Sequence, residues 1–144
     1  MSYNYKVKFT ADKGLSTLLP VITSVLESTN LFNKDELDDF RCAIYEAINN
    51  VEIHAYPNSE TKPITVELKF KDNKICAVIT DKGVGIENIE KASEPMFTSF
   101  PDECAGLGIS IMKSYSENTT IKSTVGKGTK VTIVKTLGGK SDEL

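Results

Sequence analysis

Two polar residues in the first half of the chain have types and spacing suited to chemistry. Glu46 and Asn50 lie four residues apart in a predicted helix, so their side chains share one helix face. A carboxylate can orient or deprotonate a nucleophile, and an amide oxygen is a suitable ligand for magnesium. The pair therefore indicates a catalytic or metal-binding position. The alternative is a solvated helix surface with no chemical role.

A second candidate is "DKGVGI", residues 81 to 86, which follows the apolar run "KICAVIT". One glycine suffices for a plain turn, so Gly83 and Gly85 indicate a backbone that something approaches closely. Asp81 could accept a hydrogen bond from a flat heterocycle at the strand end, with the glycines letting the backbone close around the ring. The alternative is an ordinary turn at the end of a strand.

The third candidate is "GLG", Gly106 to Gly108, at the start of a predicted helix. Backbone N–H groups at a helix N-terminus bind anions, and glycines let a phosphate come near. A loop-to-helix junction would explain the same pattern. "VGKGTK" is not a P-loop, because Ile121 occupies the position of its first glycine. His54, the only histidine, is interpreted as satisfying the last helix carbonyls or filling local packing.

Hydrophobic periodicity and turn residues predict the elements that would position these candidates. The predicted strands cover residues 3–11, 64–70, 74–80, 119–125 and 129–137. The predicted helices cover residues 15–29, 33–56, 86–92 and 106–117. Their order favours an α+β fold, a two-layer α/β sandwich whose mixed, mostly antiparallel sheet carries helices on one face.

The two long helices of the first half have further signals. Pro20 lies inside the first and predicts a break or kink. Asn33 and Glu36 form a capping-box pattern at the start of the second, and Pro57 ends it. Apolar residues recur at helical spacing on the face of the second helix that should pack on the sheet: Leu37, Phe40, Ile44, Ile48, Val51 and Ala55.

The composition is that of one globular domain, predicted to span residues 1–137 with a flexible tail at 138–144. The net charge of -3 argues against a general nucleic-acid binder, which needs a basic face. No signal peptide or membrane span is recognised, which predicts a cytoplasmic protein. Cys42, Cys76 and Cys104 form no C-x-x-C pair and are interpreted as reduced thiols.

Four sequence stretches, taken together in their order along the chain, resemble the motifs of a known family, although each stretch alone is a weak signal. "EAINNVEIHAY", "DKGVGI", "GLGISIMK" and "GKGTKVTI" resemble the N, G1 and G2 boxes and the closing hairpin of the gyrase/histidine-kinase ATPase superfamily. Within it the chain looks most like the anti-sigma factor serine kinases, and "DKGVGIENIEKASEPMFTSFP" is especially similar to the sporulation anti-sigma-F factors. The resemblance covers roughly residues 3–135 and implies a histidine-kinase-like ATPase fold with ATP held in the helical layer.

The resemblance also implies the roles of individual residues. Glu46 matches the catalytic base and Asn50 the magnesium ligand. Asp81 matches the adenine-binding aspartate, with Thr129 beside it through a water molecule. The positions that match the G1 turn and the phosphate loop are Gly83, Gly85, Gly106, Leu107 and Gly108. ATP and Mg²⁺ are the implied cofactors.

The implied function is an anti-sigma factor that sequesters a sigma factor as a homodimer and phosphorylates a serine of a STAS-type anti-anti-sigma protein. Neither nucleic acid nor membrane is an expected partner. The chain departs from the sporulation type, because no Lys or Arg occurs between Lys91 and Lys113. Phosphoryl transfer usually needs such positive charge. The alternative is therefore a regulatory binding module that uses ATP without significant kinase activity. An ATPase domain of a sensor histidine kinase is a third, less favoured reading.

Overall fold

The computed structural model of the chain describes residues 5–13, 17–87 and 118–138. Most of the short helix expected at residues 86–92 lies outside the described residues, as does the whole helix expected at 106–117. The phosphate-loop candidates Gly106, Leu107 and Gly108 and the predicted tail beyond Gly138 also lie outside them. The description below concerns the remaining parts of the chain.

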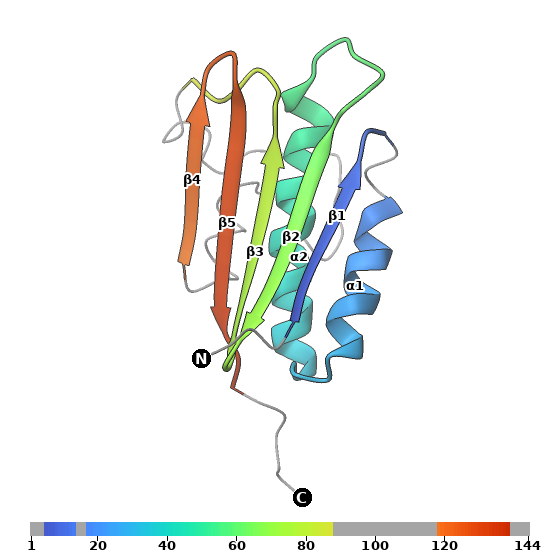
Figure 1. Ribbon diagram of the computed structural model, residues 1–144, viewed down its shortest axis with the longest axis vertical. Coiled ribbons are helices and arrows are strands. Elements are labelled where there is room, and N and C mark those ends of the chain that lie inside the picture. Colours follow the sequence, from blue (N-terminus) through green and yellow to red (C-terminus); the bar gives the residue numbers. More distant parts are fainter. Residues whose placement is uncertain (1–4, 14–16, 88–117, 139–144) are drawn as a thin grey trace, which may run out of the picture.

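A five-stranded sheet forms one layer of the molecule (Figure 1). Its strands are β1 (Tyr5–Ala11), β2 (Ile64–Lys71), β3 (Lys74–Asp81), β4 (Asn118–Thr124) and β5 (Gly128–Thr136). The spatial order is β1-β2-β3-β5-β4, and each described pair is antiparallel. The predicted sheet is confirmed, although no parallel pair occurs among the described strands. Short connections explain two of these pairs, because β2 to β3 and β4 to β5 are hairpins.

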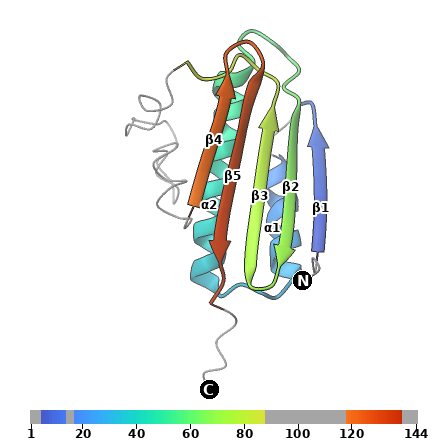
Figure 2. The same ribbon diagram turned by 60° about the vertical axis from the view of Figure 1, so that its left-hand side comes forward.

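The helices lie together on one face of this sheet, as Figures 1 and 2 both show. They are α1 (Leu18–Ser28), α2 (Lys34–Asn50) and a short π-helix, η2 (Val51–Ala55), that continues α2. The other face of the sheet carries no described helix. The predicted two-layer α+β sandwich is therefore confirmed. No helix among the described residues is long and apolar enough to cross a membrane.

The start of α2 follows the predicted capping box. The backbone N–H of Glu36 donates to Asn33 Oδ1 at 2.8 Å, and the N–H of Asn33 donates to Glu36 Oε1 at 3.1 Å. Two N–H groups of the first turn, which have no acceptor inside a helix, are satisfied in this way. Such a cap contributes about 1 kcal/mol to helix stability.

The break expected at Pro20 is wrong, because α1 runs without interruption from Leu18 to Ser28. The helix begins later than predicted, which makes Pro20 its third residue. N–H groups of the first turn have no partner within the helix, so a proline there removes no hydrogen bond.

The predicted apolar face of α2 packs against the sheet. Phe40, Ile44 and Ile48 are buried, as are Val51 and Ala55 of η2. The aromatic ring of Phe40 lies 6.0 Å from that of Phe32, which in turn contacts Phe70 of β2 at 6.3 Å between ring centroids. These contacts join the helical layer to the sheet in one hydrophobic core.

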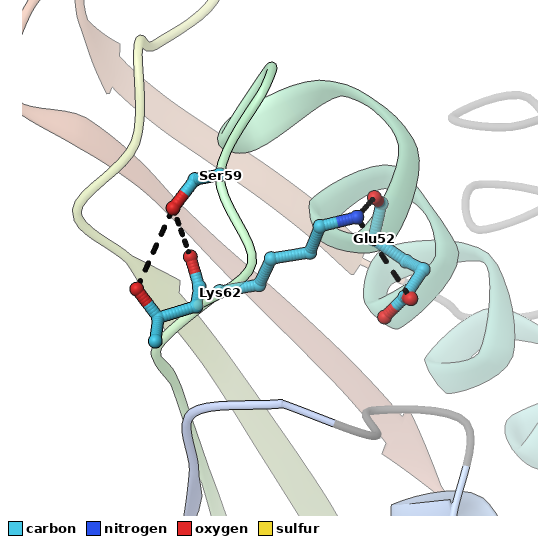
Figure 3. Close-up of polar contacts among 4 residues, drawn as sticks. Glu52, Ser59 and Lys62 are labelled. Carbon is cyan, nitrogen blue, oxygen red and sulfur yellow. Dashed lines mark hydrogen bonds and ion pairs between the residues drawn. The ribbon is translucent and has the colours of Figure 1, made fainter.

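The last turn of the long helix is not α-helical as predicted, since α2 gives way to η2 after Asn50. Lys62 lies in the loop after η2 and donates through Nζ to the backbone oxygen of Glu52 at 2.8 Å, with Glu52 Oε1 at 3.9 Å (Figure 3). Ser59, in the same loop, donates to the backbone oxygen of Thr61 at 2.9 Å. Lys62 thus satisfies a carbonyl near this helix end, a role that was expected of His54, which is exposed.

Candidate functional site

Three polar residues form one row across β3, β5 and β4 at an end of the sheet. Asp81 of β3 is opposite Thr129 of β5, and Thr129 is opposite Ser123 of β4. Asp81 continues the alternation of the buried residues Ile79 and Ala77, so it faces the helical layer. Only 7% of Asp81 and 9% of Thr129 is exposed. The predicted neighbourhood of Asp81 and Thr129 is therefore present.

The carboxyl group of Asp81 lies in a poorly hydrated position. Burial raises its pKa above the usual range, while hydrogen bonds from the backbone N–H groups of Gly83 and Thr129 act in the opposite direction. The Gly83 N–H lies 2.9 Å from Asp81 Oδ1 and fixes the orientation of the carboxyl group. Asp81 is thus a preoriented hydrogen-bond acceptor at the edge of the helical layer.

The two glycines after Asp81 are explained by close packing of the protein's own backbone. A Cβ atom on Gly83 would lie 2.1 Å from the backbone oxygen of Ala55. A Cβ atom on Gly85, whose φ is +80°, would lie 2.5 Å from the backbone oxygen of Thr124. Both glycines are therefore required by the protein's own packing at the end of β3. The expected close approach is present, but η2 and the β4–β5 hairpin supply it, and no nucleotide ring is needed to explain it.

The turn after Asp81 is also tied to the end of η2 by hydrogen bonds. The backbone N–H of Val84 donates to the oxygen of Ala55 at 2.8 Å. The hydroxyl of Tyr56 accepts from the N–H of Lys82 at 2.7 Å and donates to the oxygen of Pro63 at 2.6 Å. Tyr56 was not predicted as a site residue. Its place directly after a helix end, as in "IHAY", is the only sequence signal that could have indicated it.

Glu46 and Asn50 differ in exposure although they share a helix face. Glu46 is 1% exposed, so the solvated-surface interpretation is wrong for it. Asn50 is half-buried one turn later, at the junction with η2. A carboxylate is rarely buried this deeply unless it is paired with another group. The pair thus places a buried carboxylate and a partly accessible amide on the helix whose end is fastened beside Asp81.

The oxygen donors of the described residues fit a magnesium ion only if a bound ligand supplies further oxygens. Among the described residues no group of three or more His, Cys, Asp and Glu side chains could hold a metal ion. Magnesium, however, often binds through one or two protein oxygens together with water and substrate phosphates. Asn50 is accessible enough to supply such an oxygen.

Ser123, which was not predicted, connects three parts of this region. Its Oγ lies 2.7 Å from the backbone N of Ile86, 3.1 Å from the oxygen of Gly128 and 2.8 Å from Thr129 Oγ1. It therefore joins the end of "DKGVGI" to the β4–β5 hairpin. The β4–β5 turn is centred on Gly126 and so pairs position 123 with position 129. The predicted strands, residues 119–125 and 129–137, would instead pair position 123 with position 131, so the sequence did not indicate Ser123.

A hollow of about 600 Å³ lies where β1 ends, β2 begins and β3 ends. It is lined in part by Thr10, Thr65 and Thr80, which pair across the three strands. Thr80 directly precedes Asp81 on β3, so its side chain points to the opposite face of the sheet. Asp81 and Lys82 also line the hollow, so it adjoins the candidate site at the end of β3.

Comparison with known proteins places this arrangement in a family. Residues 9–135 match the model of the histidine kinase-like ATPase domain. The anti-sigma F factor of Clostridium beijerinckii is 40% identical over 102 residues, which cover 70% of this chain and 71% of that protein. The chain belongs to the anti-sigma F factor family of histidine kinase-like ATPases. The anti-sigma F factor of Caldanaerobacter subterraneus is likewise 40% identical, over 72% of this chain and 73% of its own length.

Solved structures agree on the fold. The mycobacterial sensor histidine kinase MprB matches with a TM-score of 0.52 and 19% identity over 90% of this chain and 97% of that chain. The histidine kinase domain of a blue-light activated kinase from Erythrobacter litoralis matches with a TM-score of 0.51 and 17% identity, over 85% and 61% of the two chains. These likenesses confirm the predicted fold.

Proposed function

We propose that this chain is an ATP-binding anti-sigma factor that sequesters a sigma factor and phosphorylates a serine of a STAS-type anti-anti-sigma protein. The observation that carries the proposal is the buried Asp81, held by Gly83 beside Thr129 on the helical side of the sheet. A buried acceptor of fixed orientation is what recognition of an adenine amino group needs. Relatives named anti-sigma F factor support the assignment of the partner.

The residues divide the work as follows. Asp81 accepts a hydrogen bond from the base, and Thr129 supports the same contact through a water molecule. Asn50 contributes an oxygen to Mg²⁺, which neutralises charge on the phosphates when ATP is bound. Glu46, which is buried on α2, accepts the proton of the attacking serine hydroxyl. Gly106, Leu107 and Gly108 complete the phosphate contacts.

The proposal includes a homodimer that acts in the cytoplasm, with a sigma factor and an anti-anti-sigma protein as its macromolecular partners. Direct binding to nucleic acid is not part of it, because the net charge is -3. Mass spectrometry of proteins that co-purify with the chain from its own cell would identify both partners. Absence of any sigma factor among them would contradict the proposed sequestration.

A second candidate function is favoured by one specific observation. No Lys or Arg occurs between Lys91 and Lys113, the segment that joins the adenine turn to the phosphate loop. Without that charge, ATP could serve to select partners in a binding module without significant kinase activity. The buried Glu46 favours the kinase instead.

The experiment that separates these functions is ATP binding and phosphoryl transfer measured side by side on wild type and Glu46→Gln. ATP with magnesium should raise the melting temperature of both proteins, because ligand at a hundred times its Kd adds about 2.7 kcal/mol to stability. Transfer to the co-purified partner should fall by roughly 10²–10⁴-fold in the variant. Binding without transfer in the wild type would support the binding module, and no binding of any nucleotide would overturn both.

A further inference from the structure

The hydroxyl group of Ser123 has three neighbours and uses its full hydrogen-bonding capacity. They are the backbone N–H of Ile86 at 2.7 Å, the backbone oxygen of Gly128 at 3.1 Å and the hydroxyl of Thr129 at 2.8 Å. A serine hydroxyl has one hydrogen to donate and two lone pairs with which to accept. Three partners therefore leave no spare capacity at Ser123.

The chemistry of the partners decides the direction of each bond. The N–H of Ile86 can only donate, so Ser123 accepts from it. The carbonyl of Gly128 can only accept, so Ser123 gives it its one hydrogen. The remaining bond must then run from the Thr129 hydroxyl to Ser123. Although either hydroxyl could donate in isolation, the set of three bonds permits only this direction.

The direction of this bond fixes what Thr129 can offer to a ligand. Its single hydroxyl hydrogen points at Ser123, so its oxygen can only accept from other groups. Asp81, directly opposite on β3, is also an acceptor when ionised. The two buried residues thus present acceptors side by side on the helical face.

We infer that Ser123 is a positioning residue that holds the Thr129 hydroxyl as an acceptor and so favours a base with an amino group over one with a carbonyl. This inference rests on the proposed function, since it concerns the base of the bound nucleotide. Adenine carries an amino donor at the position where guanine carries a carbonyl acceptor. A site with only acceptors leaves a carbonyl without a partner and rejects it. A bridging water enforces the same choice when it donates one hydrogen to Thr129 and the other to Asp81, because it can then only accept from the base.

The test compares the ratio of ATP to GTP affinity among variants of the full chain by calorimetry. In Ser123→Ala the Thr129 hydroxyl can rotate and donate to a carbonyl, so the ratio should fall about tenfold, the effect of roughly one hydrogen bond. Ser123→Thr keeps the hydroxyl and should restore the ratio. Thr120→Ala removes an exposed hydroxyl from the same strand and should leave the ratio unchanged.

A double-mutant cycle shows whether Ser123 acts through Thr129. Thr129→Val removes the hydroxyl that Ser123 orients, so adding Ser123→Ala to it should cause no further change in the ATP to GTP ratio. A merely structural role would lower stability and affinity for both nucleotides equally in either background. Equal losses, or an unchanged ratio in Ser123→Ala, would overturn the inference.

A measurement without nucleotide separates this inference from the proposed function. Ser123→Ala removes the acceptor of the Ile86 amide, so the hydrogen exchange of that amide should accelerate while exchange in β2 stays unchanged. Unchanged exchange at Ile86 would overturn the hydrogen-bond assignment itself. Failure of the wild type to bind any nucleotide would overturn the proposed function, and with it the effect on base preference, even if the exchange result holds.

Discussion

Two neighbouring rows of side chains cross the same three strands and have opposite characters. The first row, Asp81, Thr129 and Ser123, faces the helices. The second row consists of the adjacent residues on the same strands, Thr80, Lys130 and Lys122, and faces the open side of the sheet. In the first row Asp81 and Thr129 are buried, and all three residues have hydrogen-bond partners. In the second row both lysines are exposed.

This difference shows that a polar residue indicates a function mainly where it faces the helical layer. A polar group on the open side stays hydrated and costs little, so its presence there is uninformative. A polar group on the helical side loses its hydration and must be satisfied by the protein or by a ligand. Substitutions in or beside the buried row should therefore have large and specific effects, and substitutions in the exposed row small ones.

The largest effect on stability is expected from Gly83→Ala, directly beside the buried row. The added Cβ would lie 2.1 Å from the backbone oxygen of Ala55, so the turn must separate from η2. We expect a loss of about 3 kcal/mol or more in the free energy of unfolding, measured in urea. Gly138→Ala is the matched control, because its Cβ meets only a side-chain oxygen of Glu36 at 3.4 Å. Equal stability of both variants would contradict the packing described at Gly83.

Asp81→Asn should weaken ATP binding about tenfold or more, since the preoriented acceptor is partly lost. The same variant tests the raised pKa of Asp81. A carboxyl group whose pKa is raised by folding makes the folded state less stable as pH rises through the range between its unfolded and folded pKa values.

The stability of Asp81→Asn relative to wild type should therefore increase as pH rises from about 4 towards neutrality, because asparagine does not ionise. Thermal unfolding of both proteins across this range measures the difference. A difference that is constant with pH would show that folding does not perturb this carboxyl group.

Tyr56→Phe should have a moderate effect. The hydroxyl accepts from the N–H of Lys82 and donates to Pro63, so its loss leaves two backbone groups without their partner. We expect about 1–2 kcal/mol lower stability in urea. ATP affinity should also fall, because the turn that orients Asp81 loses one of its attachments. An ATP affinity equal to that of wild type would mean that Val84 and Gly83 hold the turn without Tyr56.

The smallest effect is expected in the exposed row. Lys130→Ala removes a hydrated side chain on the open face and should change stability by less than about 0.5 kcal/mol. ATP affinity, measured by the same calorimetry, should stay at the wild-type value. A marked loss of ATP affinity would break the comparison, since it would place nucleotide contacts on the open face of the sheet.

Much of this protein could be predicted because the relevant signals are local. The capping box at Asn33 depends on two residues three apart, and the hairpins at "KDNK" and "GKG" follow from alternation and turn residues. The apolar face of α2 follows from helical spacing. Order and spacing of the motifs carried the family resemblance, which the comparisons confirm. The prediction failed at Pro20, where the exact start of α1 decided the outcome.

The sequence by itself thus determined the strands, the family and the two long helices apart from the start of α1 and the turn after Asn50, because backbone preference and hydrophobic period are properties of neighbouring residues. Only the tertiary structure decided that Glu46 is buried. It also decided that the backbone of Ala55 leaves no room for a side chain at Gly83, and that of Thr124 none at Gly85. The hydrogen bond between Ser123 and the hydroxyl of Thr129 is likewise a tertiary contact. These facts depend on which backbone groups of distant segments come within a few ångströms of one another. Such contacts arise from the packing of η2 and the β4–β5 hairpin around one turn, which no local pattern of residues encodes.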